Sequence, residues 1–226
     1  MIILKLTHIF LIVLLLPLTV HARNAAPWVG ADLKGLPCSG KGQGYGPYDY
    51  TKANERSKIP VVEEHHFTPE VENHISGKSG YIENDLDYTL RAVPNHHRAL
   101  LSAIRYQLKL NKKQLKRNDP LEAPMECYLQ RAIHFSPSDA ATVSLYAYYL
   151  KGIGQLEKAT DLYQKALTIA PDNAKIQYAY SLLLIELKQY DKALEYAKKA
   201  YTHDKTPEAL KNKLIKLGVW KVPADK

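Results

Sequence analysis

The residues best suited to chemistry are histidines gathered in the first half of the chain. Imidazole nitrogens bind zinc and copper, and they also exchange protons near neutral pH. A metal site needs such ligands to converge on the ion at about 2 Å, and a helix supplies two of them when they stand three or four positions apart. The histidines that could form such a site are His65, His66, His74, His96 and His97.

The spacing of these histidines does not by itself build a metal site. The pairs His65–His66 and His96–His97 are adjacent in sequence, and neighbouring side chains on a helix point about 100 degrees apart. A metal would need the two pairs and His74 to meet through the fold. The competing interpretation is that each imidazole caps a helix, hydrogen bonds a tyrosine or carboxylate, or lies at the surface. We favour this interpretation and keep a metal-binding or metal-dependent accessory role as the alternative function.

Patterns for other catalysis are weak. Ser39, Ser76 and Ser79 fall in expected loops, and none stands in the G-x-S-x-G pattern of a nucleophile elbow. Acid pairs such as Glu63 with Glu64 are routine on helix surfaces. The sequence therefore predicts a protein that is not an enzyme and that needs no cofactor.

The elements that would position these residues repeat along the second half of the chain. Pro171 follows Pro137 by 34 residues, and Ala200 follows Ala166 by the same step. A 34-residue period is typical of stacked two-helix hairpins. Gly154 falls in the turn between two such helices, and Pro171 ends the second helix because proline cannot continue it.

These units, residues 138–205, resemble tetratricopeptide repeats, as in YAYYLKGIGQLEKATDLYQKALTIAPDN. Val143 and Gln177 replace the tryptophan that is usual in the first helix of a unit. The resemblance implies an all-α, right-handed solenoid of helical hairpins whose concave groove holds a peptide or a partner's helix, and it does not imply catalysis. The positions that carry it are Ala147, Gly154, Leu156, Ala159, Tyr163, Ala166 and Pro171, then Tyr180, Ser181, Leu184, Tyr190, Ala193, Ala197 and Ala200.

Weaker repeats precede these two units. Pro94 stands 43 residues before Pro137, so the unit between them is predicted to carry roughly nine extra residues in the basic loop NKKQLKRNDPLEAPME. Before it we expect a degenerate hairpin, with a short helix from Thr68 closed near Gly77 and a second helix over 81–93. The predicted organisation is a signal peptide (1–22), an irregular Gly/Pro/Tyr-rich lead-in (23–59), the degenerate hairpin (60–94), the unit with the insertion (95–137), two repeats (138–171 and 172–205) and a capping helix (206–220).

The chain begins with the pattern of a secretory signal peptide. Lys5 precedes the apolar run from Ile9 to Leu16, and Val20-His21-Ala22 ends it with small residues at the positions that signal peptidase reads. We predict cleavage after Ala22; the alternative is an uncleaved anchor, because the run approaches the lower limit for a membrane span. Cleavage would give a periplasmic or secreted protein of net charge +7, which is +8 less Lys5. Nucleic acid is not an expected partner, because the basic residues do not interleave with aromatics.

The lead-in carries one cysteine and several tyrosines. In an exported protein, Cys38 and Cys127 either pair or stay buried and inert. We favour the bridge, which would pin the lead-in to the repeats. Tyr45, Tyr48 and Tyr50 are expected to lie on the repeat surface or in its groove, where a ring can be buried while its hydroxyl stays wet.

The resemblance also implies where a partner would bind. In tetratricopeptide repeats the first helix of each hairpin lines the concave face, which here mixes cationic, aromatic and apolar residues. Such a face suits another envelope protein or peptide segment that bears some acid, unless the lead-in fills the groove itself. The sequence therefore predicts an exported scaffold for protein–protein interaction. The positions predicted to contact the partner are Arg98, Arg105, Lys109, Ser144, Tyr148, Lys151, Lys175, Tyr178, Ile185 and Glu186.

Overall fold

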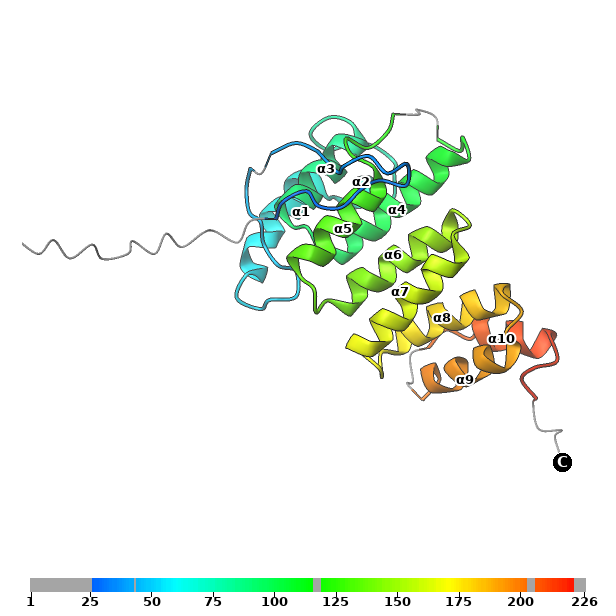
Figure 1. Cartoon of the computed structure of the whole chain (residues 1–226). Coiled ribbons are helices and arrows are strands. Elements are labelled where there is room, and N and C mark those ends of the chain that lie inside the picture. The colour runs from blue at the N-terminus through cyan, green and yellow to red at the C-terminus, as the bar shows by residue number, and fades with distance from the viewer. Residues whose placement is uncertain (1–25, 43, 116–118, 203–205, 222–226) are drawn as a thin grey trace, which may run out of the picture.

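Helical hairpins stacked side by side make up the molecule in the computed structural model (Figure 1). The structure describes residues 26–42, 44–115, 119–202 and 206–221, and within them it contains α-helices, one short 3-10 helix and no strand, which confirms the predicted all-α solenoid. The predicted signal peptide lies outside the described residues. The elements are η1 (Arg56–Lys58), α1 (Ile59–His66), α2 (Pro69–Glu72), α3 (Ile82–Ala92), α4 (His97–Asn111), α5 (Met125–Phe135), α6 (Ala140–Gly152), α7 (Leu156–Ile169), α8 (Ala174–Glu186), α9 (Tyr190–Ala200) and α10 (Ala209–Lys216).

None of the helices in those ranges has the length and apolar content needed to cross a membrane.

One recurring connection joins the hairpins. Helices α3, α5 and α7 end in nearly the same backbone conformation, with φ/ψ of −135/84 at Val93, −133/77 at Ser136 and −138/78 at Ala170. A proline follows each of these residues and prevents the helix from continuing. The three helices therefore occupy equivalent places, each as the second helix of a hairpin.

The helix after each connection begins at a side-chain cap. The side chain of His96 accepts a hydrogen bond from the amide of Ala99, and those of Asp139 and Asn173 accept bonds from the first turns of α6 and α8. Such caps satisfy amides that have no partner within the helix. Asp139 and Asn173 stand 34 residues apart, and His96 and Asp139 stand 43 apart, so the caps carry the same periods as the prolines. We call α4, α6 and α8 the first helices.

Small buried residues let the two helices of a hairpin approach closely. Ala147 of α6 and Ala159 of α7 are both fully buried, as the repeat pattern predicts. In the next hairpin the hydroxyl of Ser181 donates to the backbone oxygen of Ala193 at 2.6 Å. Burial between neighbouring hairpins joins these contacts into one core that runs from Phe67 to Leu214.

The first hairpin differs from its prediction. No helix was expected at Ile59–His66, yet α1 forms there with Pro60 in its first turn, where proline's missing amide costs nothing. The helix expected to reach Gly77 is a single turn, α2, because His74 adopts a left-handed conformation with φ of 60°. Thr68 precedes α2 but its side chain forms no cap bond. Helix α1 packs on α3, and α2 packs on α3 and α4.

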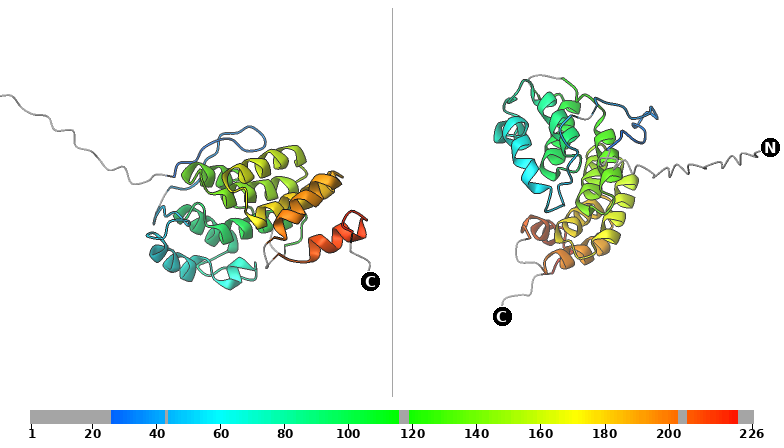
Figure 2. Two further views of the ribbon diagram at one scale, coloured as in Figure 1. Left: turned by 90° about the horizontal axis from the view of Figure 1, so that it is seen from below. Right: turned by 90° about the vertical axis from the view of Figure 1, so that its left-hand side faces the viewer.

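The lead-in is fastened to the outer side of α5, a second helix (Figure 2). The predicted bridge between Cys38 and Cys127 is present. Around it, Gln130 Nε2 donates to the oxygen of Ala31 at 2.8 Å, and Arg131 Nε donates to the oxygen of Ala26 at 2.7 Å. This part of the lead-in therefore lies against a second helix.

Further along, the lead-in meets the connection between α3 and α4. Gly46 has φ of 88°, and a Cβ there would stand 2.2 Å from the oxygen of Ala92, so glycine is needed for this approach. The amide of Tyr48 donates to that same oxygen at 2.9 Å. Tyr50 lies 4.5 Å from His96, measured between ring centroids. The tyrosines of the lead-in thus lie on the surface of the repeats.

Asn95 is the buried centre of this junction. Its side-chain nitrogen donates to Asp49 Oδ1 at 2.8 Å and to Asp139 Oδ2 at 3.0 Å, and its oxygen accepts from the amide of Tyr50 at 2.9 Å. Burial alone would raise the pKa of Asp49, but hydrogen bonds from Thr51, Asn95 and Ser136 outweigh it and hold that pKa below its ordinary value. One amide thus connects the lead-in, the start of α4 and the cap of α6.

Helix α10 packs on α8 and α9. Leu210 and Leu214 are fully buried there. Leu217 shares their helical spacing but is 44% exposed, because α10 ends at Lys216 and the chain turns away. The hydroxyl of Thr206 donates to the oxygen of Ala200 at 2.7 Å.

Removing the hydroxyl from two buried tyrosines should affect the free energy of unfolding differently. Tyr163 has no hydrogen-bond partner for its hydroxyl among the described residues, whereas Tyr128 donates to Asp87 Oδ1 at 2.6 Å. We predict that Tyr163→Phe leaves the free energy of unfolding unchanged or raises it, and that Tyr128→Phe lowers it by about 1 to 3 kcal/mol. Equilibrium unfolding in urea measures both. A loss above about 1 kcal/mol in Tyr163→Phe would show that its hydroxyl is bonded.

Candidate functional site

The histidines are directed to different partners. Among the described residues, no group of three or more His, Cys, Asp or Glu side chains is placed to hold a metal ion. His65 is exposed, and His74 lies apart on the connection after α2. The remaining pairs are His66 Nδ1 with Asp85 Oδ1 at 2.9 Å, His96 Nε2 with Glu63 Oε1 at 3.0 Å and His97 Nε2 with Asp139 Oδ2 at 2.7 Å. The structure therefore does not bring the five histidines together.

His96 illustrates the structural use of these side chains. It is fully buried, and burial lowers its pKa, although Glu63 opposes the shift. Its Nδ1 accepts the hydrogen bond of the Ala99 amide at 3.1 Å, so the proton of the neutral ring stands on Nε2 and is donated to Glu63. Both ring nitrogens form hydrogen bonds. One bond caps α4, and the other joins α4 to α1.

Asp139 has a similar structural role at the start of α6. Its burial would raise the pKa, but hydrogen bonds from His97, Thr142 and Asn95 outweigh that effect and hold the pKa of the carboxyl below its ordinary value. The carboxylate is therefore ionised near neutral pH. It caps α6 and receives the hydrogen bond of His97 from α4, which orients two first helices relative to each other.

The caps fix the register of the first helices. Counting from His96, Asp139 and Asn173, equivalent positions fall at the same distance from each cap. The fifth residues are Leu101, Ser144 and Tyr178, and the ninth are Arg105, Tyr148 and Leu182. The partner-contacting positions predicted from the repeat pattern therefore share one side of α4, α6 and α8, which we call the first-helix face.

Exposure differs along the first-helix face. Arg98, Arg105, Lys175 and Glu186 are exposed, and Lys109, Ser144, Tyr148, Lys151 and Tyr178 are half-buried. Ile185 is 6% exposed and packs into the core, so it offers little surface to a partner. The face therefore combines exposed charges of both signs with two half-buried tyrosine rings.

Several charges on this face pair with one another. Lys151 Nζ lies 2.7 Å from Glu186 Oε2 and so links α6 to α8. Arg98 binds Glu72 of α2 and Glu63 of α1, the latter at 3.2 Å. The exposed parts of such pairs contribute little to stability, but they hold the side chains in defined positions on the face.

A cavity of about 740 Å³ opens beside the carboxyl-terminal half of α4. The connection between α2 and α3 forms one wall, and Tyr106 and Lys109 of α4 form another, with Gln114 and Leu115 at the start of the inserted loop. The sequence placed Lys109 on the binding face but gave no sign of the cavity, since its walls come from three separate segments. Gly77 and Gly80 also line the cavity, but in the sequence they indicate only a turn.

His74 lines this cavity, and both of its ring nitrogens have hydrogen-bond partners. Its Nε2 lies 3.0 Å from the backbone oxygen of Ser102, and its Nδ1 lies 3.0 Å from Lys109 Nζ. An ammonium can only donate, so Nδ1 accepts and the ring proton stands on Nε2. Burial, together with the charge of Lys109, lowers the pKa of His74 to about 4.

Comparison with known proteins agrees with the repeat pattern. Residues 150–211 match the family model described as tetratricopeptide repeat. A curated relative, BBSome complex member BBS4 of Bos taurus, is 32% identical over 78 residues, which are 34% of this chain and 15% of that protein. The chain thus spans a small part of that relative's length.

Solved structures of MamA are also similar in arrangement. One is 16% identical with a TM-score of 0.43, and the alignment covers 72% of this chain and 84% of the MamA chain. Another is 17% identical with a TM-score of 0.42 and covers 75% of this chain and 82% of its own.

Removing His74 should change how stability depends on pH. The ring binds fewer protons in the folded protein than in the unfolded chain, because its pKa falls from 6.5 to about 4. Its contribution is therefore fully present above about pH 6.5 and is lost as pH falls toward about 4. His74→Asn keeps a residue that tolerates the left-handed conformation and should flatten the fall in unfolding free energy across that window.

Urea unfolding at several pH values between 4 and 7 measures this effect. His96 and the carboxylates titrate in both proteins, so the difference between wild type and His74→Asn isolates His74. Parallel stability curves for the two proteins would show that His74 titrates in the folded protein as it does in the unfolded chain.

Proposed function

We propose that this chain, which carries tetratricopeptide repeats, is a non-catalytic scaffold that binds another protein through its first-helix face. The observation that carries the proposal is the common register of α4, α6 and α8 from their caps. Equivalent residues of three stacked helices then form one continuous surface. Tyr148 and Tyr178 supply ring area to that surface, and Lys175 supplies exposed charge.

The position of the lead-in supports an accessible face. Its described contacts include α5 through Cys127, Gln130 and Arg131. They also reach the connection before α4 through Asn95 and the first residue of α4, where the ring of Tyr50 lies 4.9 Å from that of His97. These sites belong to the outer side and the edge of the hairpins. A partner can therefore approach the first helices without displacing the described lead-in.

The non-catalytic part of the proposal is supported by the fate of the reactive side chains. His96 has both ring nitrogens bonded and is fully buried, and His97 and Asp139 serve the cap of α6. General acid–base catalysis needs such groups within reach of a substrate proton. Here their hydrogen bonds are used to hold helices together.

An exported location in the cell envelope is also part of the proposal. The amino-terminal sequence supports it through its signal-peptide pattern, and the Cys38–Cys127 bridge supports it because disulfides persist in oxidising compartments. The name of the BBS4 relative describes a member of a complex, and binding to another protein is the role proposed for this chain.

Crosslinking in an envelope extract tests the face. Mature protein serves as bait beside a face variant, Tyr148→Ala with Lys175→Glu. The matched control, Tyr190→Ala with Lys165→Glu, makes equivalent changes on the second helices α9 and α7. We expect wild type and control to capture the same partner and the face variant to capture at least tenfold less, because it removes a ring contact and reverses a charge.

Circular dichroism melting of all three proteins checks that they fold. Equal capture of the partner by a folded face variant would contradict binding through the first-helix face. Equal loss in the face variant and the control would contradict it as well, since the effect would then not depend on the face.

A further inference from the structure

We propose that the cavity beside α4 binds a segment of a partner protein in which an apolar side chain stands close to carboxylates. This inference rests on the proposed function, because it assumes that the chain binds a protein. It adds a second contact site at one end of the first-helix face and states the chemistry of the occupant.

The apolar side of the cavity is unusually open to solvent. Ile75 is 73% exposed and Tyr81 is 52% exposed, and both line the cavity with the half-buried Ile82 and Leu115. Large apolar side chains grouped around a hollow of about 740 Å³ are typical of a binding site. An aromatic or aliphatic side chain of the partner would remove this surface from water.

The charge around the cavity favours an acidic occupant. Lys109 forms part of the wall, and Arg105, Lys112 and Lys113 are exposed on the same stretch of α4 and its end. The acid in the lining, Glu83, is 8% exposed. Cations at the rim and a buried acid leave a positive surface for incoming carboxylates.

Lys109 is already positioned to receive a carboxylate. Its ammonium donates to His74 Nδ1 at 3.0 Å, and this bond uses one of three N–H groups. The neutral imidazole accepts that bond without cancelling the positive charge. A lysine held by a neutral acceptor loses less side-chain freedom on binding, and its bond to a carboxylate is charge-assisted.

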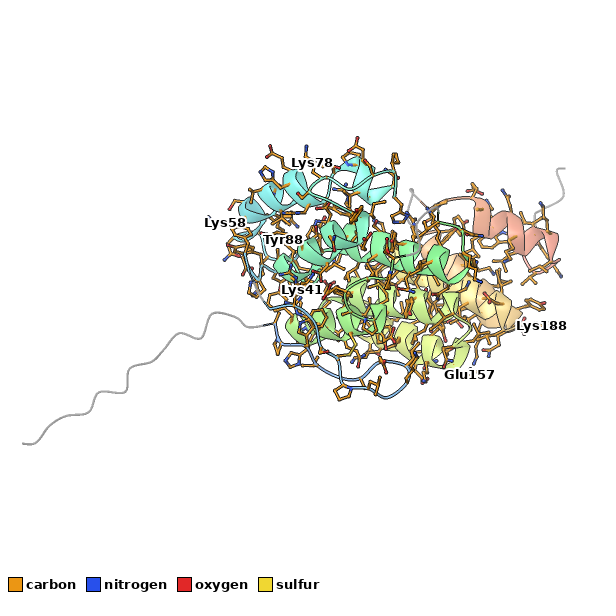
Figure 3. All side chains as sticks on the ribbon, turned by 90° about the horizontal axis from the view of Figure 1, so that it is seen from above. Lys41, Lys58, Lys78, Tyr88, Glu157 and Lys188 are labelled. Carbon is orange, nitrogen blue, oxygen red and sulfur yellow. A yellow bond between two sulfur atoms is a disulfide. The ribbon has the colours of Figure 1, made fainter. Side chains whose placement is uncertain are left out.

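The cavity continues the first-helix face. Lys109 belongs to both, whereas the other walls come from the connection after α2, the start of α3 and the insertion after α4. Figure 3 places Lys78, which belongs to that connection, at the same end of the molecule as Lys58 and far from Lys188 at the end of α8. A segment that lies along the first helices would therefore reach the cavity at one end of its path.

A random 12-residue peptide library displayed on phage provides a defined probe. It is selected on the mature protein, and the consensus peptide is synthesised with a fluorescent label for anisotropy titrations. We expect the consensus to combine an aromatic or aliphatic residue with two or more neighbouring Asp or Glu residues. Its affinity should fall at least tenfold for Lys109→Gln, which removes the charge, and for Gly80→Trp, which fills the cavity.

Matched controls separate the cavity from the rest of the surface. Lys165→Gln removes one exposed charge from the second helix α7, and Gly42→Trp adds the same bulk at another glycine whose Cβ position is open. Both should bind the peptide as wild type does. A Cβ at Gly80 would likewise have no atom within 4 Å, so Gly80→Trp should fold. This variant keeps the test valid if Lys109→Gln is unstable.

Four results would overturn the proposal. A peptide that binds all variants equally would bind outside the cavity. A consensus without Asp or Glu would contradict the proposal that the occupant carries carboxylates. A peptide sensitive to Lys175→Gln and to Tyr148→Ala, but not to Gly80→Trp, would bind the first-helix face; it would reject the cavity while supporting the proposed function. Failure to enrich any peptide would also reject the cavity, and the crosslinking experiment then decides the proposed function separately.

Discussion

The side-chain amide of Asn95 is the interaction on which the arrangement of the chain depends. It is fully buried, and its atoms bind Asp49 and Tyr50 of the lead-in and Asp139 at the cap of α6. A buried polar atom left without its partner costs roughly 1 to 3 kcal/mol, so each of these groups holds the others in place. The lead-in is thereby fixed at the edge of the hairpins.

That same junction sets the phase of the repeats. Asp139 caps α6 as Asn173 caps α8, and both stand after a proline that ends the previous helix. Because the caps recur with the prolines, the faces of α4, α6 and α8 align. The insertion after α4 leaves this phase intact and instead builds one wall of the cavity next to Lys109.

The sequence was enough to predict the features that depend on neighbouring residues and on the repeat period. The 34-residue spacing of prolines and alanines indicated the hairpins, and the candidate bridge between Cys38 and Cys127 is present. Contacts between distant segments could not be predicted: Asn95 and Tyr50 are 45 residues apart, and no pattern joins them. The left-handed conformation of His74, which ends α2 and shapes the cavity, could not be predicted either, because only a few per cent of non-glycine residues adopt it.

Hydrogen exchange of Asn95→Ala against wild type tests most directly whether this junction joins the lead-in to the repeats. The account predicts that amides of residues 48–51 and of the first turn of α6 lose protection, while those of α8 and α9 keep it. Asn173→Ala is the matched control, because it removes a cap that does not touch the described lead-in and should affect only the start of α8. Unchanged protection of residues 48–51 in Asn95→Ala would contradict the account.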